Sequence, residues 1–182
     1  MGLRRMAGLI LGLCCGGAVA LPPQLSDAAP FVTTPPAAIA RMLTLAGVDP
    51  EDVVYDLGAG DGRIVIAAAR DFGARGVGIE YDEALVRIAR LNAERAGVSH
   101  RVRFLQGDLF AADLRDATVV TMFLRETLNR RLRPQLWQQL SPGTPVVSYR
   151  FGMGGDWRPE HQEVFEGESI YLWRVPSAAA AP

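Results

Sequence analysis

Asp56-Leu57-Gly58-Ala59-Gly60-Asp61-Gly62-Arg63 is the stretch that decides the fold of this 182-residue chain. The apolar run Val53-Val54-Tyr55 before it predicts a short buried strand, and the run from Ile64 to Ala69 predicts the first turns of a helix. A strand, a glycine-rich turn and a helix in that order form a ligand-binding corner at the carboxyl end of a parallel sheet. The nature of the ligand then depends on the glycine spacing and on the flanking residues.

Strands and helices alternate along the rest of the chain. The predicted strands are 53–57, 76–80, 102–106, 117–122 and 145–151, followed by a closing hairpin of 163–165 and 170–175 across Gly167. This alternation predicts an α/β fold with a mostly parallel sheet and right-handed crossovers. The hairpin must add at least one antiparallel strand at an edge of the sheet.

The first and last predicted helices carry prolines. The first begins at 33–36, where threonine suits the cap and proline the first turn, and it ends at Gly47. In the last helix, leucines recur every four residues over 128–140, which predicts an amphipathic helix. Pro134 lies inside this stretch and predicts a break or kink there.

Two further helices lie between the first strands. One follows the glycine-rich stretch over 63–70. The other begins at Asp82, which suits an N-cap, and is closed by Gly97. Its side chains that recur at spacings of three and four are Leu85, Ile88, Leu91 and Asn92.

Composition excludes several classes of site. The 19 basic residues, all arginine, against 20 acidic residues give a net charge of -1, so no bulk basic character indicates a nucleic-acid partner. Both cysteines, Cys14 and Cys15, lie near the amino terminus, so the rest of the chain has no thiol nucleophile or cysteine metal site. Two histidines are too few for a histidine-rich metal centre, and we predict no metal.

The amino-terminal residues predict targeting. Arg4 and Arg5 precede an uncharged apolar run that ends in Ala18-Val19-Ala20, which is typical of a secretory signal peptide over 1–20. The alternative is an uncleaved membrane anchor, which would also leave the following domain outside. We therefore expect a protein that is exported to the periplasm or anchored in the inner membrane. The predicted segments after 1–20 are a linker over 21–30, the folded domain over 31–175 and a tail over 176–182.

The glycine spacing and the acids beside it indicate a cationic ligand. A dinucleotide-binding turn has the spacing G-x-G-x-x-G, whereas Gly58, Gly60 and Gly62 give G-x-G-x-G, with Asp56 and Asp61 beside them. Carboxylates repel a pyrophosphate and attract a cation. S-adenosylmethionine has an ammonium and a sulfonium group and no phosphate, so the stretch favours this cofactor.

Three strand ends together resemble the class I methyltransferase pattern. These are D-L-G-A-G-D-G at 56–62, the acid Glu80 at the end of the second strand, and G-D-L at 107–109. The resemblance implies a Rossmann-like three-layer α/β sandwich whose mostly parallel seven-stranded sheet has an antiparallel last strand. It also implies that Asp56 and the glycine-rich backbone hold the methionine end of S-adenosylmethionine, and that Glu80 binds the ribose hydroxyls.

A narrower resemblance covers nearly the whole predicted domain. It rests on 31–35, on the glycine-rich stretch with its helix, on 147–151 and on 156–159. These segments are similar to a protein-lysine methyltransferase family that includes the mitochondrial enzymes for the ATP synthase c-subunit and the adenine nucleotide translocase. The two resemblances imply the following cofactor-binding residues: Thr34, Asp56, Gly58, Ala59, Gly60, Asp61, Glu80, Tyr81, Asp108 and Leu109. For each acid the alternative is a helix cap or a solvated strand end.

The implied activity is methyl transfer from S-adenosylmethionine to a protein lysine by direct in-line attack. The segment 121–124 lacks the Asp/Asn-Pro-Pro-Tyr sequence of enzymes that methylate adenine or glutamine amides, which argues against nucleic-acid bases. No catalytic residue is identified; Asn129 and Tyr149 are candidates for a general base, with structural roles as the alternative. The other two hypotheses are a small-molecule methyltransferase and an exported cofactor-binding module without turnover.

Overall fold

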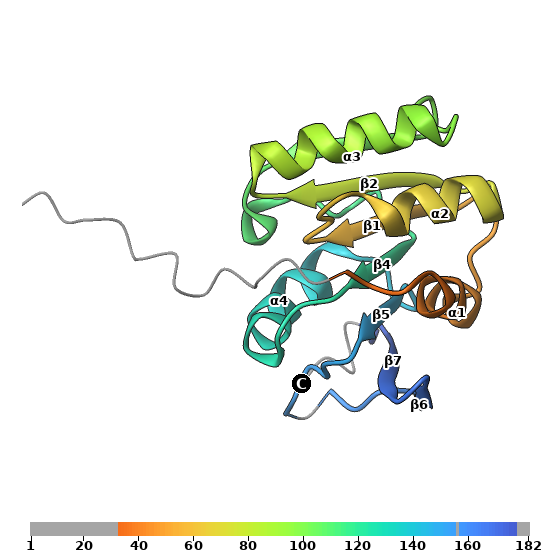
Figure 1. Ribbon diagram of the computed structural model, residues 1–182. Helices are drawn as coiled ribbons and strands as arrows, with labels where there is room; N and C mark the ends of the chain where they lie inside the picture. Colours follow the sequence, from red (N-terminus) through yellow and green to blue (C-terminus); the bar gives the residue numbers. More distant parts are fainter. Residues whose placement is uncertain (1–32, 156, 178–182) are drawn as a thin grey trace, which may run out of the picture.

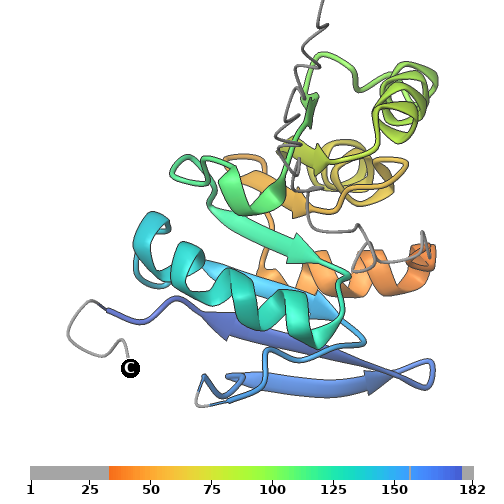
Figure 2. The same ribbon diagram turned by 90° about the vertical axis from the view of Figure 1, so that its left-hand side faces the viewer.

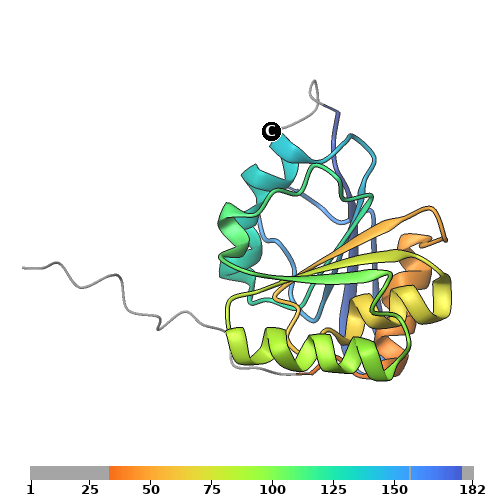
Figure 3. The same cartoon turned by 90° about the horizontal axis from the view of Figure 1, so that it is seen from above.

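The computed structural model describes residues 33–155 and 157–177, which form a seven-stranded sheet covered by helices on both faces (Figure 1). The predicted targeting segment 1–20, the linker 21–30 and the last residues of the tail lie outside the described residues. Figure 2 and Figure 3 show α1, α2 and α3 on one side of the sheet and α4 on the other. The predicted three-layer α/β sandwich is therefore confirmed.

Five parallel strands run in the order β3-β2-β1-β4-β5. Their bounds are β1 Val53–Leu57, β2 Arg75–Glu80, β3 Val102–Gln106, β4 Val119–Met122 and β5 Pro145–Tyr149. In the centre of the sheet, Asp56 of β1 lies in register with Gly78 of β2 and with Thr121 of β4. The strand order reverses beside β1, and ligands bind at such a switch point, outside the carboxyl ends of the strands.

The sheet ends in an antiparallel hairpin. Strand β7 (Glu168–Arg174) pairs antiparallel with β5 and with the edge strand β6 (His161–Phe165). Glu166 and Gly167 connect β6 and β7 with φ of 50° and 86°, and two positive φ angles in a two-residue loop match the turn that suits the twist of a hairpin. The predicted hairpin across Gly167 and the antiparallel last strand are confirmed.

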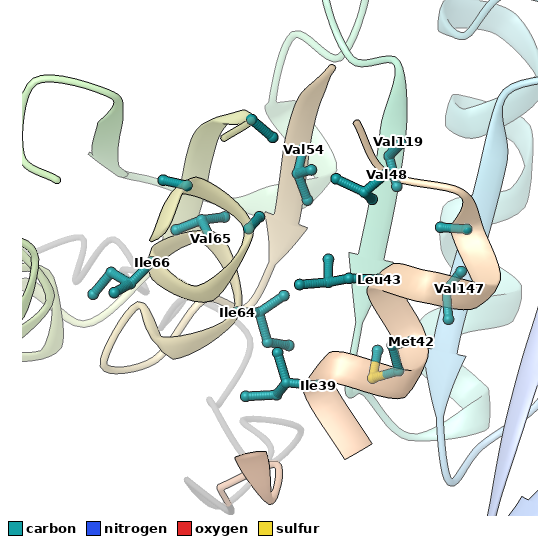
Figure 4. Packing of buried hydrophobic residues seen from close by; sticks show 14 of the residues in the cluster. Ile39, Met42, Leu43, Val48, Val54, Ile64, Val65, Ile66, Val119 and Val147 are labelled. Atoms are coloured by element: carbon teal, nitrogen blue, oxygen red, sulfur yellow. The ribbon is translucent and has the colours of Figure 1, made fainter. Parts of the chain in front are cut away.

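The helices are α1 Pro36–Ala46, α2 Arg63–Phe72, α3 Glu83–Arg95 and α4 Glu126–Gln139, with a short 3₁₀ helix, η1, over Leu109–Ala111. Ile39 and Leu43 of α1 point toward Ile64 of α2 and toward the strands, where Val54 and Val119 lie (Figure 4). This packing closes the core on the α1 face. Among the helices of the described residues, none combines the length and the apolar character needed to cross a membrane.

The start of α1 differs from its prediction. Pro35 is the N-cap and has no side-chain cap, so the predicted threonine cap is wrong. Thr34 lies one residue earlier and is only 3% exposed, because this segment folds against the glycine-rich turn. Proline in the first turn and Gly47 at the end of the helix, with φ of 74°, agree with the prediction.

Helix α3 buries small residues. Asp82 caps it as predicted, accepting a hydrogen bond from the Ala84 N–H at 2.7 Å. Its buried residues, however, are Val86, Ala89 and Ala93, whereas Ile88 and Leu91 are 44% and 50% exposed. The recurrence of large apolar residues therefore did not mark the packed face, because the alanines let α3 approach the sheet closely.

Helix α4 continues through Pro134, so the predicted break is wrong. Proline removes one backbone donor and leaves the carbonyl of Arg130 without its helical partner. Both residues are exposed, so water is available to this carbonyl. The opposite face of α4 buries Leu132 and Leu136 in the second half of the core.

Gly78 provides a test of how closely the turn and the sheet pack. A Cβ atom at this position would lie 2.6 Å from Cδ1 of Phe104 and 2.8 Å from Cβ of Ala59. Gly78→Ala is therefore expected to lower the free energy of unfolding by ~1–3 kcal/mol, measured by chemical denaturation. The control Gly107→Ala places its Cβ in open space and is expected to change stability far less. Equal stabilities of the two variants would contradict the packing described.

Candidate active site

The glycine-rich turn between β1 and α2 is fastened to the end of β2. The N–H groups of Gly58 and Ala59 both donate to the Ile79 carbonyl, each at 2.9 Å, and the Gly60 N–H donates to Oε2 of Glu80 at 2.8 Å. All three glycines of the turn have positive φ, between 56° and 84°, a conformation that residues with a Cβ rarely adopt. The turn therefore requires its glycines and is held in place against the end of β2.

Asp56 is the buried carboxylate of the site. It is 2% exposed, and its Oδ1 accepts a hydrogen bond from Thr121 Oγ1 at 2.8 Å. Burial raises the pKa of Asp56 to about 7; the hydrogen bond from Thr121 lowers it, and the negative charges of Glu80 and Asp61 raise it. A positively charged ligand would stabilise the ionised form of such a carboxylate. The chemistry of this corner therefore fits a cation.

Asp61 has its own cation. Its Oδ2 lies 2.6 Å from Nη2 of Arg63, and its Oδ1 accepts from Arg63 Nε at 2.9 Å. Burial raises the pKa of Asp61, but the hydrogen bonds and charge of Arg63 outweigh it, so the pKa lies below its usual range. Arg63 Nη1 also donates to the Thr34 carbonyl at 3.2 Å. The ion pair thus ties the segment before α1 to the glycine-rich turn and brings Thr34 to the site.

The remaining predicted residues follow β2 and β3. Glu80 accepts from the Asp82 N–H at 3.0 Å with Oε1 as well as from the turn with Oε2, so its carboxylate faces the glycine-rich turn. Tyr81 is 62% exposed. Asp108 accepts from the Phe110 N–H at 2.9 Å and begins η1, of which Leu109 is the first residue. All these residues lie at the carboxyl edge of the sheet, where the resemblance placed them.

Sequence reasoning missed three residues of this corner. Thr121 binds the carboxylate of Asp56, Arg63 neutralises Asp61, and Leu124 lies over the turn, with Cδ2 at 3.0 Å from where a Cβ of Gly58 would be. The arginine directly after the glycines was a signal that local sequence offered. Thr121 and Leu124 had no such signal, because their position depends on β4 lying beside β1.

Asn129 and Tyr149, the two candidates for a general base, are both buried in the fold. Asn129 is fully buried, and its Nδ2 donates to the carbonyls of Phe151 and Gly152 at 3.1 Å each. Tyr149 is 5% exposed, and its pKa is raised, first by burial and then by the negative charge of Glu168. A tyrosine with a raised pKa stays protonated at neutral pH and cannot accept a proton there.

Comparison with known proteins places the chain in a family. Residues 56–161 match the family model of the ANTKMT methyltransferase domain. A protein-lysine N-methyltransferase of Saccharolobus islandicus (strain REY15A) is 46% identical over 151 residues, which are 80% of this chain and 93% of the relative. An adenine nucleotide translocase lysine N-methyltransferase of Mus musculus is 38% identical over 130 residues, 71% of this chain. The chain spans only 56% of that mouse relative.

Solved structures of similar proteins indicate which cofactor is used. The crystal structure of an RNA methyltransferase from Salinibacter ruber, in complex with S-adenosyl-L-homocysteine, is 57% identical with a TM-score of 0.79, and the match covers 80% of this chain and 95% of that chain. A SAM-dependent methyltransferase from Geobacter sulfurreducens, also with S-adenosyl-L-homocysteine, is 27% identical with a TM-score of 0.57, over 63% of this chain and 48% of that chain. S-adenosyl-L-homocysteine is S-adenosylmethionine without its methyl group.

The residues present fit S-adenosylmethionine. The buried carboxylate of Asp56 suits its positive charge, and Gly58 leaves the exposed part of the turn without a side chain. Glu80 offers a carboxylate to hydroxyl groups beside the turn. The chain belongs to the ANTKMT methyltransferase-domain family and is a class I methyltransferase that uses S-adenosylmethionine.

Proposed function

We propose that this enzyme methylates the side-chain amine of a lysine in a protein substrate. The observation that carries the proposal is the 46% identity to a protein-lysine N-methyltransferase over 93% of that relative's length. The site is consistent with it, because a lysine amine is strongly nucleophilic once neutral and needs alignment and desolvation more than a dedicated base. Neither Asn129, a neutral amide, nor Tyr149, whose raised pKa keeps it protonated at neutral pH, is a general base.

Different residues of the site would bind the cofactor and the acceptor. S-adenosylmethionine, when bound, supplies an electrophilic methyl group on its sulfonium. Asp56 and the glycine-rich turn would hold the methionine end, and Glu80 would hold the ribose. Leu124, in the segment after β4, lies against the turn at Gly58. The acceptor then approaches over the ends of β4 and β5.

RNA is a second candidate substrate, because the Salinibacter ruber relative is described as an RNA methyltransferase. The exposed residues Arg125, Arg130 and Arg131 of α4 offer positive charge to a phosphate backbone. Against this candidate, residues 121–124 read Thr-Met-Phe-Leu and lack the Asp/Asn-Pro-Pro-Tyr sequence whose acceptor groups hold the amino group of a base. Protein lysine therefore remains the first proposal.

We also propose that residues 1–20 direct the protein to the periplasm or anchor it in the inner membrane. The basic start, the apolar run and the Ala-x-Ala sequence support this proposal. Cell fractionation of a carboxyl-terminally tagged protein, with the mass of the mature chain, tests it. Cleavage after Ala20 or recovery with the inner membrane is expected. A full-length protein found only in the cytoplasm would contradict both forms of the proposal.

An activity assay tests the substrate class. The purified full-length chain is incubated with S-adenosylmethionine labelled on its methyl group and with a membrane extract. We expect label in protein, recovered as methyllysine after acid hydrolysis and removed by protease. Label that ribonuclease removes would establish the RNA alternative, and label confined to small molecules would establish a small-molecule methyltransferase.

Glu80→Gln tests the ribose contact. Removing the charge of this acceptor is expected to weaken S-adenosyl-L-homocysteine binding by ~1–3 kcal/mol, measured by isothermal titration calorimetry. The matched control is Glu83→Gln, because Glu83 is exposed on α3 and pairs with Arg87 at 2.7 Å. Unchanged affinity in Glu80→Gln would remove Glu80 from the cofactor site.

The raised pKa of Asp56 predicts a pH-dependent cofactor affinity. Below its pKa of about 7 this carboxyl is mostly protonated, and a cationic ligand favours its ionised form. Affinity for S-adenosylmethionine is therefore expected to rise with pH up to about 7 and to level off above it. Asp56→Asn should bind more weakly than wild type above pH about 7, lose this dependence, and approach the wild-type affinity as pH falls. A wild-type affinity that is flat between pH 5.5 and 8.5, a window of about 1.5 pH units on either side of that pKa, would contradict the assignment.

The same pKa predicts the stability of the protein without ligand. The folded pKa of about 7 lies above the ordinary value of 3.8, so between these values the unfolded state binds fewer protons and stability falls as pH rises. Asp56→Asn removes this loss and is expected to melt at a higher temperature than wild type at pH 8, and to approach it at pH 4. Scanning calorimetry at both pH values measures the difference. A lower melting temperature for the variant at pH 8 would contradict the prediction.

A further inference from the structure

The chain leaves β5 through a strained turn. The Phe151 N–H donates to the Tyr149 carbonyl at 2.9 Å, a bond between residues i and i+2, and Arg150 between them has φ of 71°. This is a γ-turn with positive φ, a rare conformation for a residue with a side chain. Among the described residues, only Glu166 shares a positive φ without being glycine, and the β6–β7 hairpin explains that one. Arg150 therefore needs another explanation.

A buried polar network holds the turn. Ser148 Oγ donates to the Phe151 carbonyl at 2.6 Å, and Asn129 Nδ2 donates to the carbonyls of Phe151 and Gly152 at 3.1 Å each. Both Ser148 and Asn129 are fully buried. Backbone strain of this kind costs about 1–3 kcal/mol and persists only where surrounding contacts impose it. Asn129 of α4 and Ser148 of β5 thus fix the backbone after β5.

The turn brings two aromatic rings against a third. The ring of Phe123, directly after β4, lies 5.0 Å from the ring of Tyr149 at 82° and 6.1 Å from the ring of Phe151 at 23°. Phe123 and Phe151 are half-buried, whereas Tyr149 is only 5% exposed. We name Phe123, Tyr149 and Phe151 the aromatic cluster.

The aromatic cluster adjoins the cofactor site. Phe123 lies two residues after Thr121 and so on the same face of the sheet, and Thr121 hydrogen-bonds to Asp56 at 2.8 Å. Tyr149 ends β5, the next strand along. The cluster therefore lies at the carboxyl edge of β4 and β5, next to the carboxylate that would hold the charged end of S-adenosylmethionine.

We propose that the aromatic cluster is the acceptor pocket, which receives the lysine side chain beside the cofactor. Lysine has a long apolar stem and a cationic head, and aromatic rings contact the stem and attract the head through their faces. Binding as the cation is followed by loss of a proton to solvent, which partial desolvation of the amine by the rings favours, and the neutral amine then attacks. The strained turn orients the rings of Tyr149 and Phe151 toward this pocket. The proposal rests on the proposed function and names the residues that contact its substrate.

The test uses Phe123→Leu and Phe151→Leu in the full-length chain. The substrate is the protein of the membrane extract that wild type labels, purified from that extract. Each variant is expected to raise KM for this protein roughly 2- to 30-fold, which corresponds to one lost cation–π contact. The Kd for S-adenosyl-L-homocysteine should stay within about 2-fold of wild type, because no cofactor contact is removed. The matched control is Phe72→Leu, a half-buried phenylalanine at the far end of α2 from the turn.

A second pair of variants tests the positioning role of the turn. Arg150→Gly and Glu166→Gly each place glycine where φ is already positive, so both relieve strain. Only Arg150→Gly should raise KM for the protein substrate, because only this turn aims the aromatic rings. Glu168→Gln controls for the ion pair of Arg150 with Glu168, whose atoms lie 3.0 Å apart.

The outcomes separate the two proposals. Wild-type labelling of lysine with unchanged KM in Phe123→Leu and Phe151→Leu would overturn the acceptor pocket and leave the proposed function standing. Loss of S-adenosyl-L-homocysteine binding in these variants would also overturn the pocket, since the rings would then belong to the cofactor side. Wild-type label found only on RNA or on small molecules would overturn both.

Discussion

The close approach of the glycine-rich turn to the end of β2 is the constraint on which the rest of the structure depends. Two N–H groups of the turn share the Ile79 carbonyl, and a third binds the carboxylate of Glu80. Such contacts require positive φ in the turn and small residues beneath it, such as Gly78 against Ala59. They set the direction of α2 and the position of Glu80.

Of the two aspartates in this corner, only Asp61 is paired with a cation of the protein, and this difference gives the site its chemistry. Asp61 is neutralised by Arg63, which also carries the segment before α1 into place. Asp56 has only a hydroxyl donor in Thr121 and is deeply buried, so its pKa rises to about 7. A buried carboxylate without a cation of the protein is costly unless a ligand brings one. Within a few residues the fold therefore holds one carboxylate paired with an arginine and one buried carboxylate paired only with a hydroxyl.

The two halves of the site are built by different means. On the cofactor side, backbone N–H groups of the turn bonded to β2 hold the geometry, together with the side-chain contacts of Thr121 and Arg63. On the side of β4 and β5, buried side chains from distant segments hold it, with Asn129 of α4 fastening the backbone after β5.

The sequence by itself determined the α/β class, the glycine-rich corner, the cap at Asp82 and the hairpin across Gly167, because each depends on residues a few positions apart. Only the tertiary structure decided the partner of Asp56, which is 65 positions away, the clamp from Arg63 to Thr34, and the strained turn at Arg150. It also decided that α3 buries alanines and that α4 continues through an exposed proline. These features depend on which strands become neighbours and which faces they cover, and local periodicity carries no information about either.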